Sequence, residues 1–230
     1  DCVGEMAGRF GFPQERYKKF PWGVDLGHFV PGKSAELRAR LGWQEKVVLL
    51  SNRSFEKLYG VDVIVKAFIR ARQANPELRL LIYGQGSQET ALRQMLKKSG
   101  YLSDVYFGGF ASYEQLPEVY HSADLYLSAS HSDGSSVSLM EALACGLPAI
   151  VSDIPGNREW IKEDENGWLF KDGKEDELEQ KILLAAGQVK SLTRMKAGNR
   201  LLAEIRANWD KNIKVLLEAY DLAVIGAAHA

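Results

Sequence analysis

Two basic side chains stand four positions apart in the loop that follows the first predicted strand. Arg53 and Lys57 lie in the segment 52–60, immediately before a predicted helix. The backbone N–H groups and the dipole at a helix N-terminus favour an anion, and the two cations add to that attraction. The loop is therefore a candidate site for a phosphate or a diphosphate. A pair of solvated surface cations is the alternative, and charge by itself favours it, because charged side chains are mostly exposed.

The densest polar segment spans residues 130–159 and contains two acids. Asp133 and Gly134 lie in a loop, Ser135 or Ser136 can cap the helix that follows, and Glu141 lies on that helix. Eight helical residues rise about 12 Å, more than the about 5–9.5 Å between the two acids of a glycosidase. The two carboxylates could instead hold the two ends of one extended, polyhydroxylated ligand. The alternative is that Asp133 caps the helix while Glu141 is exposed or paired.

The spacing of other residues excludes several further kinds of site. The first strand–helix turn lacks the glycines of a dinucleotide fingerprint, which argues against an NAD-dependent enzyme. Gly84 and Gly86 form a tight turn that lets backbone approach a ligand. Residues 130–133 include the residue types of a hydrolase triad, but contiguous residues do not converge as triad members must. The four histidines lack metal-like spacing, so no metal site is expected. No cofactor is expected either.

Alternating strand and helix patterns predict the elements that position these residues. Short, continuous apolar runs predict strands at 46–51, 78–83, 105–107, 124–127 and 149–152. Between them lie predicted helices, including 88–98, 136–145 and one that starts with a capping box at Ser112 and Gln115. The repetition predicts an α/β fold: a Rossmann-like doubly wound parallel sheet with right-handed crossovers. Helices are expected beyond Gly173, the last with an apolar stripe at Leu216, Leu217, Tyr220 and Val224.

Composition and charge limit the class of protein. The chain has 230 residues, of which 46% are hydrophobic, as is ordinary for a globular protein. A formal net charge of −1 gives no overall attraction to nucleic acid or to an anionic membrane. No apolar run approaches the roughly 20 residues of a membrane span. The chain has only two cysteines, so it is expected in a reduced compartment, the cytoplasm. Peripheral attachment of a longer protein to a membrane stays open.

The start of the chain fits the strand–helix scheme poorly. It contains several prolines and glycines, lacks an initiator Met and shows no complete strand–helix unit. We therefore expect a piece of a longer protein, with a connector at 1–44, the Rossmann-like domain at 45–208 and a C-terminal helix at 209–230.

Four segments match, in the same order, motifs of one known family. They are PWGVD at 21–25, SNRSFEKLYG at 51–60, LIYGQG at 81–86 and DGSSVSLMEALACGLPAI at 133–150. They look like the family's PNGVD, its G-R-L-x-x-x-K-G loop, its strand-plus-glycine turn and its E-x7-E motif. On these motifs the chain resembles the C-terminal half of the GT-B "glycosyl transferases group 1" family, which are retaining enzymes with nucleotide-sugar donors. Three motif residues differ from the family's: Asp133 replaces Glu, Ser136 replaces Pro and Trp22 replaces Asn.

The resemblance implies a role for each matching residue. Arg53 and Lys57 would bind the donor diphosphate and stabilise it as it leaves. Asp133 would contact hydroxyls of the transferred sugar, with a reach shorter than that of Glu by roughly 1.3 Å, and Glu141 would hold the ribose hydroxyls. The segment 110–116 would hold the nucleobase, largely through backbone. The implied donor-binding residues are Gly84, Gly86, Phe110, Leu116, Gly134, Ser135, Ser136, Val137, Ser138 and Glu141.

The leading hypothesis is that the chain is the donor-binding domain of a metal-independent, retaining glycosyltransferase of the hexosyltransferase type. Such an enzyme moves a sugar from a nucleotide diphosphate sugar, here a UDP-sugar or a GDP-sugar, to an acceptor hydroxyl. The N-terminal acceptor domain of the same longer protein would be its partner, and the fragment alone is expected to be inactive. The alternative is a non-catalytic nucleotide-sugar-binding or interaction module, which the replacement at Asp133 suggests.

Overall fold

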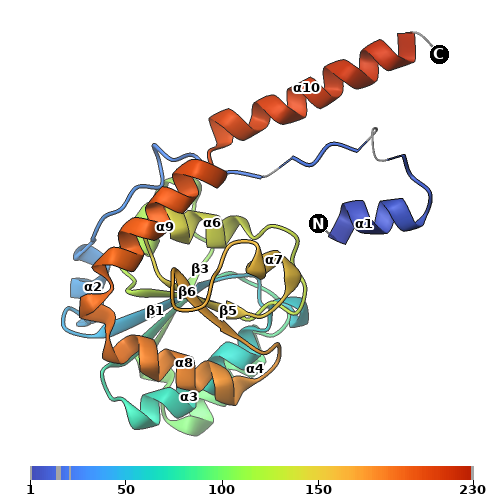
Figure 1. The fold of residues 1–230 in the computed structure, drawn as a ribbon. Helices are drawn as coiled ribbons and strands as arrows, with labels where there is room; N and C mark the ends of the chain where they lie inside the picture. The colour runs from blue at the N-terminus through green and yellow to red at the C-terminus, as the bar shows by residue number, and fades with distance from the viewer. Residues whose placement is uncertain (1, 14–16, 21, 229–230) are drawn as a thin grey trace.

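The computed structural model describes residues 2–13, 17–20 and 22–228. Six strands form one parallel sheet in the order β3-β2-β1-β4-β5-β6, with helices on both faces (Figure 1). The strands are β1 (Val47–Asn52), β2 (Leu78–Tyr83), β3 (Val105–Gly109), β4 (Leu125–Ser128), β5 (Ala149–Ser152) and β6 (Gly167–Phe170). The strand order reverses between β1 and β4, as in doubly wound sheets. The α/β fold class predicted from the sequence is confirmed.

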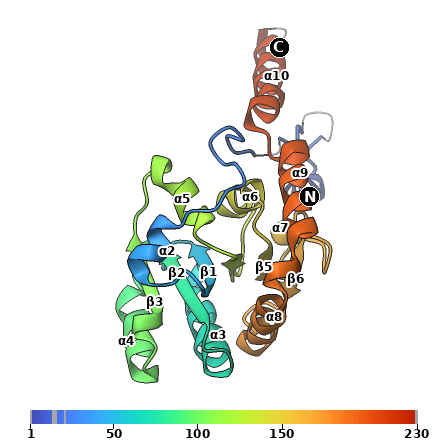
Figure 2. The same ribbon diagram turned by 90° about the vertical axis from the view of Figure 1, so that its left-hand side faces the viewer.

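Helices cover the two faces of the sheet as two groups. The helices are α1 (Cys2–Arg9), α2 (Glu36–Leu41), α3 (Val61–Ala74), α4 (Glu89–Ser99), α5 (Leu116–His121), α6 (Val137–Ala144), α7 (Pro155–Arg158), α8 (Glu175–Gly187), α9 (Thr193–Arg206) and α10 (Trp209–Ala228). Helices α3, α4 and α8 lie on one face, and α5, α6 and α9 lie on the other (Figures 1 and 2). The described residues contain no helix that is long and apolar enough to span a bilayer.

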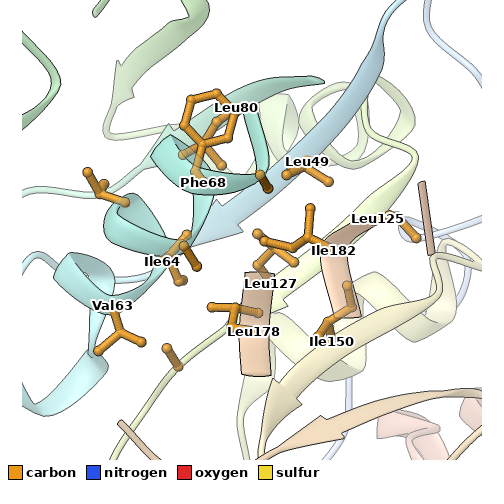
Figure 3. Close-up of a cluster of buried hydrophobic side chains, with 14 of the residues drawn as sticks. Leu49, Val63, Ile64, Phe68, Leu80, Leu125, Leu127, Ile150, Leu178 and Ile182 are labelled. Carbon is orange, nitrogen blue, oxygen red and sulfur yellow. The ribbon is translucent and has the colours of Figure 1, made fainter. Parts of the chain in front are cut away.

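Neighbouring residues of each strand point into different cores. Leu49 packs with helices α3 and α8 on one face, whereas Val48 and Leu50 belong to the cluster on the opposite face. Figure 3 shows Leu49 and Leu127 of the sheet beside Ile64 of α3 and Ile182 of α8. Burial of both faces explains why the strands read as continuous apolar runs, since each buried Leu or Ile side chain contributes roughly 1.5–3 kcal/mol.

The strand predictions agree closely with the structure, and four short elements, α1, α2, α7 and β6, were not predicted. All five predicted strands are present, and β2 and β5 have the predicted bounds. Helix α7 is a single turn, too short to show a helical period, and strand β6 begins with a glycine that interrupts its apolar run. The predicted helix at the C-terminus is α10, which projects away from the sheet (Figure 1). Its predicted apolar stripe is open to solvent, because Leu217, Tyr220 and Val224 are each more than half exposed.

The segment predicted as a connector is attached to the sheet domain. Within its described residues it contains α1 and α2, and Phe29 and Trp43 are buried in the core on the α6 side of the sheet. Val24 lies beside the start of α10: its N–H donates to the Ala207 carbonyl at 2.8 Å, and its own carbonyl accepts from the N–H of Trp209 at 3.2 Å. The chain therefore enters and leaves the sheet domain at one place.

Candidate functional site

A pocket of about 420 Å³ lies at the carboxyl ends of β1 and β4, where the strand order reverses. This is the edge at which open α/β sheets bind ligands. We call it the carboxyl-edge pocket. Its lining residues are Asn52, Arg53, Ser54, Tyr59, Leu116, Asp133, Ser135, Ser136, Val137, Ser138 and Glu141. The structure thus brings together eight of the residues singled out in the sequence, from segments far apart in the chain.

Arg53 is held on several sides at this edge. Its Nη2 lies 2.5 Å from Oδ2 of Asp133, and its Nη1 donates to the hydroxyls of Ser136 at 2.8 Å and Ser138 at 3.1 Å. The guanidinium also lies over the ring of Tyr59, 4.4 Å from its centroid. The buried Nε has no hydrogen-bond partner among the residues that the structure describes. A planar cation with a spare buried donor is suited to bind an oxyanion.

The polar end of α6 faces the same pocket. The hydroxyl of Ser136 accepts from the N–H of Leu139 at 3.3 Å, so Ser136 is the N-cap residue, one of the two expected from the sequence. Ser138 is held by the Tyr126 hydroxyl at 2.7 Å. The N–H groups in the first turn of a helix lack partners within the helix and carry the positive end of its dipole. The pocket therefore combines a helix N-terminus with the Arg53 side chain.

The two acids lie in different environments. Asp133 forms the ion pair with Arg53 and does not cap the helix. Glu141 is only 6% exposed, and it accepts a 2.6 Å hydrogen bond from the hydroxyl of Tyr120. Burial raises the pKa of Glu141 to about 7, while the Tyr120 hydrogen bond and the nearby His28 lower it. Glu141 is therefore a buried hydrogen-bond acceptor that titrates near neutral pH.

Lys57 lies on the rim rather than in the pocket. It begins a 3-10 turn, Lys57–Tyr59, and its side chain is exposed. Its ammonium group forms no ion pair or hydrogen bond with the described part of the chain, and it does not line the carboxyl-edge pocket. The turn ends at Gly60, where φ is 59° and a Cβ would lie 2.1 Å from the carbonyl oxygen of Ala129, so only glycine fits there. Lys57 is thus a free cation on a short turn beside the pocket.

The two turn glycines support the Arg53 loop instead of lining the pocket. A Cβ on Gly84, where φ is 131°, would lie 2.1 Å from the carbonyl oxygen of Arg53. A Cβ on Gly86 would lie 2.7 Å from the carbonyl oxygen of Phe55. Both clashes are with backbone, so only glycine lets the two loops lie this close. In the structure these glycines let the turn approach the backbone of the Arg53 loop, and its approach to a ligand stays a prediction.

Two other predicted residues also lie outside the pocket lining. Phe110 is 80% exposed, whereas Leu116, at the other end of the same segment, lines the pocket. Gly134 follows Asp133 in its loop and lies against α7, where a Cβ on Gly156 would come within 2.7 Å of the Gly134 carbonyl oxygen.

Sequence reasoning missed a buried tyrosine that organises the site. The hydroxyl of Tyr120 donates to Glu141, accepts from the Asn52 side chain at 3.2 Å and lies 3.2 Å from the carbonyl oxygen of Ser138. Tyr120 belongs to α5, and its separation of 21 residues from Glu141 carries no periodic signal. His28, stacked on Tyr113 at 4.1 Å, was also missed and lies close enough to lower the pKa of Glu141.

A family model described as "Glycosyl transferases group 1" matches residues 33–202, more than half of the chain. The chain is also 32% identical over 170 residues to the GtfA subunit of a UDP-N-acetylglucosamine–peptide N-acetylglucosaminyltransferase of Streptococcus pneumoniae. That match covers 68% of this chain and 33% of the relative. The chain spans about half or less of the length of the curated relatives that it matches.

Solved structures share the fold. The structure of Anabaena Alr3699/HepE in complex with UDP matches 95% of this chain and 61% of its own, with a TM-score of 0.85 and 19% identity. The C-terminal domain of LpcC, a glycosyl transferase group 1 family protein of Francisella tularensis, matches with a TM-score of 0.70 and 21% identity. That comparison covers 81% of this chain and 99% of the LpcC domain. The fold is therefore that of a GT-B C-terminal domain.

Proposed function

The chain belongs to the glycosyl transferases group 1 family, and from this premise we propose that it is the donor-binding domain of a retaining glycosyltransferase. The longer enzyme would transfer a sugar from a nucleotide diphosphate sugar to an acceptor hydroxyl. The observation that carries the proposal is the convergence of Arg53, the N-terminus of α6 and the buried Glu141 on one pocket.

The diphosphate of the donor would lie between Arg53 and the first turn of α6. Two features support this placement: the unpartnered Nε of Arg53 and the free N–H groups expected at a helix start. In the structure Asp133 neutralises part of the Arg53 charge, at a distance of 2.5 Å. A diphosphate carries more charge than one carboxylate, so it would replace Asp133 as the main partner of Arg53. Asp133 would then be free to accept hydrogen bonds from the hydroxyls of the sugar.

Glu141 would hold the ribose of the nucleotide. Its carboxylate is buried at the base of the pocket, with Oε2 fixed by Tyr120. A second carboxylate oxygen remains to accept hydrogen bonds from a pair of vicinal hydroxyls. Leu116, beside it in the pocket lining, would provide apolar contact to the nucleoside.

A uridine nucleotide is the donor that we propose first. The streptococcal relative is named for a UDP-sugar substrate, and the Anabaena structure contains UDP. A guanosine nucleotide is the second choice. The segment 110–116 would contact the base largely through backbone, so its side chains would not discriminate between the two bases.

The transfer step would depend on stabilisation of the departing nucleotide diphosphate. Charge develops on that group as the bond to the sugar breaks, and fixed positive groups stabilise it most in the transition state. Arg53 is already held in the pocket, whereas the free ammonium of Lys57 could reach the diphosphate from the rim. The acceptor would be brought by the N-terminal domain of the longer protein, so this chain alone should bind donor without transferring sugar.

Titration of the chain with UDP-, GDP- and ADP-sugars tests the proposal. Calorimetry should show one strong nucleotide class, and thermal denaturation should show stabilisation by about 2.7 kcal/mol at a hundredfold excess over Kd. The variant R53A should lose most of this affinity. R93A, which removes an exposed arginine of α4, is the matched control and should bind normally. Equal binding by R53A and the native chain would contradict the proposed diphosphate site.

The ion pair between Arg53 and Asp133 favours one alternative, a module that binds nucleotide sugar without catalysis. In such a module Asp133 would stabilise the loop through its ion pair with Arg53 and would not bind the sugar. Full-length protein carrying D133E separates the two functions. A large gain in transfer would indicate a site that has lost catalysis, whereas a loss would indicate that the aspartate is adapted to its own substrate.

A further inference from the structure

A second, larger pocket lies at the opposite edge of the sheet. Its volume is about 690 Å³, within the range of roughly 300–1,000 Å³ that is typical of small-molecule sites. Ala123 and Asp124 in its lining directly precede β4, and Leu147 shortly precedes β5. We call it the amino-edge pocket. It shares no lining residue with the carboxyl-edge pocket, so the proposed donor site does not account for it.

The charges around the amino-edge pocket are unbalanced. Four of its lining residues, Lys33, Arg38, Lys196 and Arg200, are basic, and Asp124 is the only acid among them. Arg38 is bound to Asp124 at 2.8 Å. Arg200 forms an ion pair with Glu204 at 2.6 Å and also donates to backbone carbonyls, among them that of Ala144 at 3.2 Å.

Two cations remain after these pairings. The side chains of Lys33 and Lys196 form no ion pair or hydrogen bond with the residues that the structure describes. Lys196 is half-buried, and burial together with the charges of Lys33 and Arg38 lowers its pKa. Asp124 opposes that shift and does not cancel it. A bound anion would relieve the repulsion between these like charges.

The walls of the amino-edge pocket are apolar and held in place. Pro31, Leu147 and Ala197 contribute carbon surface beside the two lysines. The connector forms one wall and is fixed on the end of α5, where His121 Nε2 lies 2.7 Å from the Val30 carbonyl oxygen. A Cβ on Gly32 would lie 2.6 Å from the same imidazole, so the connector lies as close as glycine allows. The pocket is therefore preformed rather than opened by a ligand.

From these observations we propose that the amino-edge pocket binds a small organic anion with an apolar body, whose carboxylate or phosphate lies between Lys33 and Lys196. The apolar walls select the body of the ligand, and the two unpaired ammonium groups select its charge. Such a ligand would join the connector to α9, because Lys33 comes from the first and Lys196 from the second. It would therefore stabilise the folded chain against heat.

Phenyl phosphate and benzoate are suitable probes, with benzyl alcohol as the uncharged analogue and inorganic phosphate as the anion without an apolar body. Titration of the 230-residue chain, followed by calorimetry and by thermal denaturation, should show one site for at least one aromatic anion. Benzyl alcohol and inorganic phosphate should bind at least tenfold more weakly. The stronger of the two aromatic probes identifies the anionic group that the site accepts.

Substitution of the lysines locates the site. K196M and K33M keep an apolar stem without the charge, and each should weaken the probe about tenfold, the effect of losing one hydrogen bond to a charged group. K98M, at the exposed end of α4, is the matched control and should bind normally. K33M changes an exposed residue, so it tests the site even if K196M perturbs the fold. UDP should not displace the probe.

Four results would overturn this inference. They are the absence of binding by both aromatic anions, unchanged affinity in both lysine variants, equal binding of benzyl alcohol, and displacement of the probe by UDP. The first three do not depend on whether the carboxyl-edge pocket binds a nucleotide sugar, so this site and the proposed donor site can fail independently.

Discussion

The hydroxyl of Tyr120 lies 2.6 Å from a carboxylate oxygen of Glu141, and both side chains are buried. The Tyr120 hydroxyl connects the side chain of Asn52, at the end of β1, to Glu141 on α6 through hydrogen bonds. It thereby fixes the orientation of the acid that we propose as the ribose ligand. This pair gives the first two predictions.

Y120F should shift the pH dependence of nucleotide binding toward higher pH. The Tyr120 hydrogen bond lowers the pKa of Glu141, so its loss raises that pKa further above about 7. Because the carboxylate is the better acceptor for ribose hydroxyls, binding should require a more alkaline solution. UDP titrations from pH 6 to 9 measure the shift. Y220F, on the exposed face of α10, should leave the profile unchanged, and an unshifted profile in Y120F would contradict the coupling.

E141Q should stabilise the folded chain at pH 8 and much less at pH 5. Burial raises the pKa of Glu141 from 4.5 to about 7, so between these values the folded chain binds more protons than the unfolded one. The free energy of unfolding therefore falls as pH rises through this window, by about 3 kcal/mol at most. Gln cannot ionise and avoids this loss, while it still accepts from Tyr120.

Thermal denaturation at both pH values measures the effect of E141Q. E118Q, on the exposed side of α5, is the control and should show no such pH dependence. The same difference in Tm at pH 5 and at pH 8 would show that Glu141 does not titrate in this window. At pH 8, E141Q should also bind UDP more weakly, because a neutral amide replaces the carboxylate.

D133N should destabilise the empty chain, and saturating UDP should restore most of the loss. Arg53 is only 10% exposed, so removing its charged partner leaves a buried cation that is less well compensated, at a cost of about 1–3 kcal/mol. A bound diphosphate would supply the missing charge. Denaturation with and without UDP measures both effects. D153N breaks an exposed ion pair with Arg158 and should cost little in either condition.

K57A should reduce sugar transfer by the full-length protein by a few orders of magnitude without changing its stability. Lys57 is exposed and makes no contact that the empty structure needs, so its loss should be felt only when charge develops on the leaving diphosphate. K57R should restore part of the activity, and K98M should behave as the native enzyme. Near-normal turnover by K57A would remove Lys57 from the proposed mechanism.

G84A should weaken nucleotide binding as well as stability. The added Cβ would lie 2.1 Å from the carbonyl oxygen of Arg53, so the loop that carries Arg53 must move. G173A is the matched control, since Gly173 also has a positive φ but a Cβ there meets no atom within 4 Å. G173A should therefore cost only backbone strain and should bind UDP normally. Equal binding by both variants would show that Gly84 does not position Arg53.

The sequence by itself determined the local structure of this protein. Short, continuous apolar runs in the sequence located five of the six strands. Such runs arise because both faces of the sheet are buried. The capping box at Ser112 and Gln115 and the N-cap at Ser136 depend on residues within one turn, and both are present. The motifs also identified the family before any contact was known.

Only the tertiary structure decided how these parts act on one another. Asp133 meets Arg53 across 80 residues because β1 and β4 are neighbours in the sheet, and nothing in either segment specifies that partner. The same strand order buries Tyr120 against Glu141 and leaves Lys57 on the rim. It also gathers Lys33 and Lys196 at the opposite edge, where no motif indicated a site. Local patterns record which face of an element is buried, whereas pairing between distant side chains depends on how the elements are arranged in space.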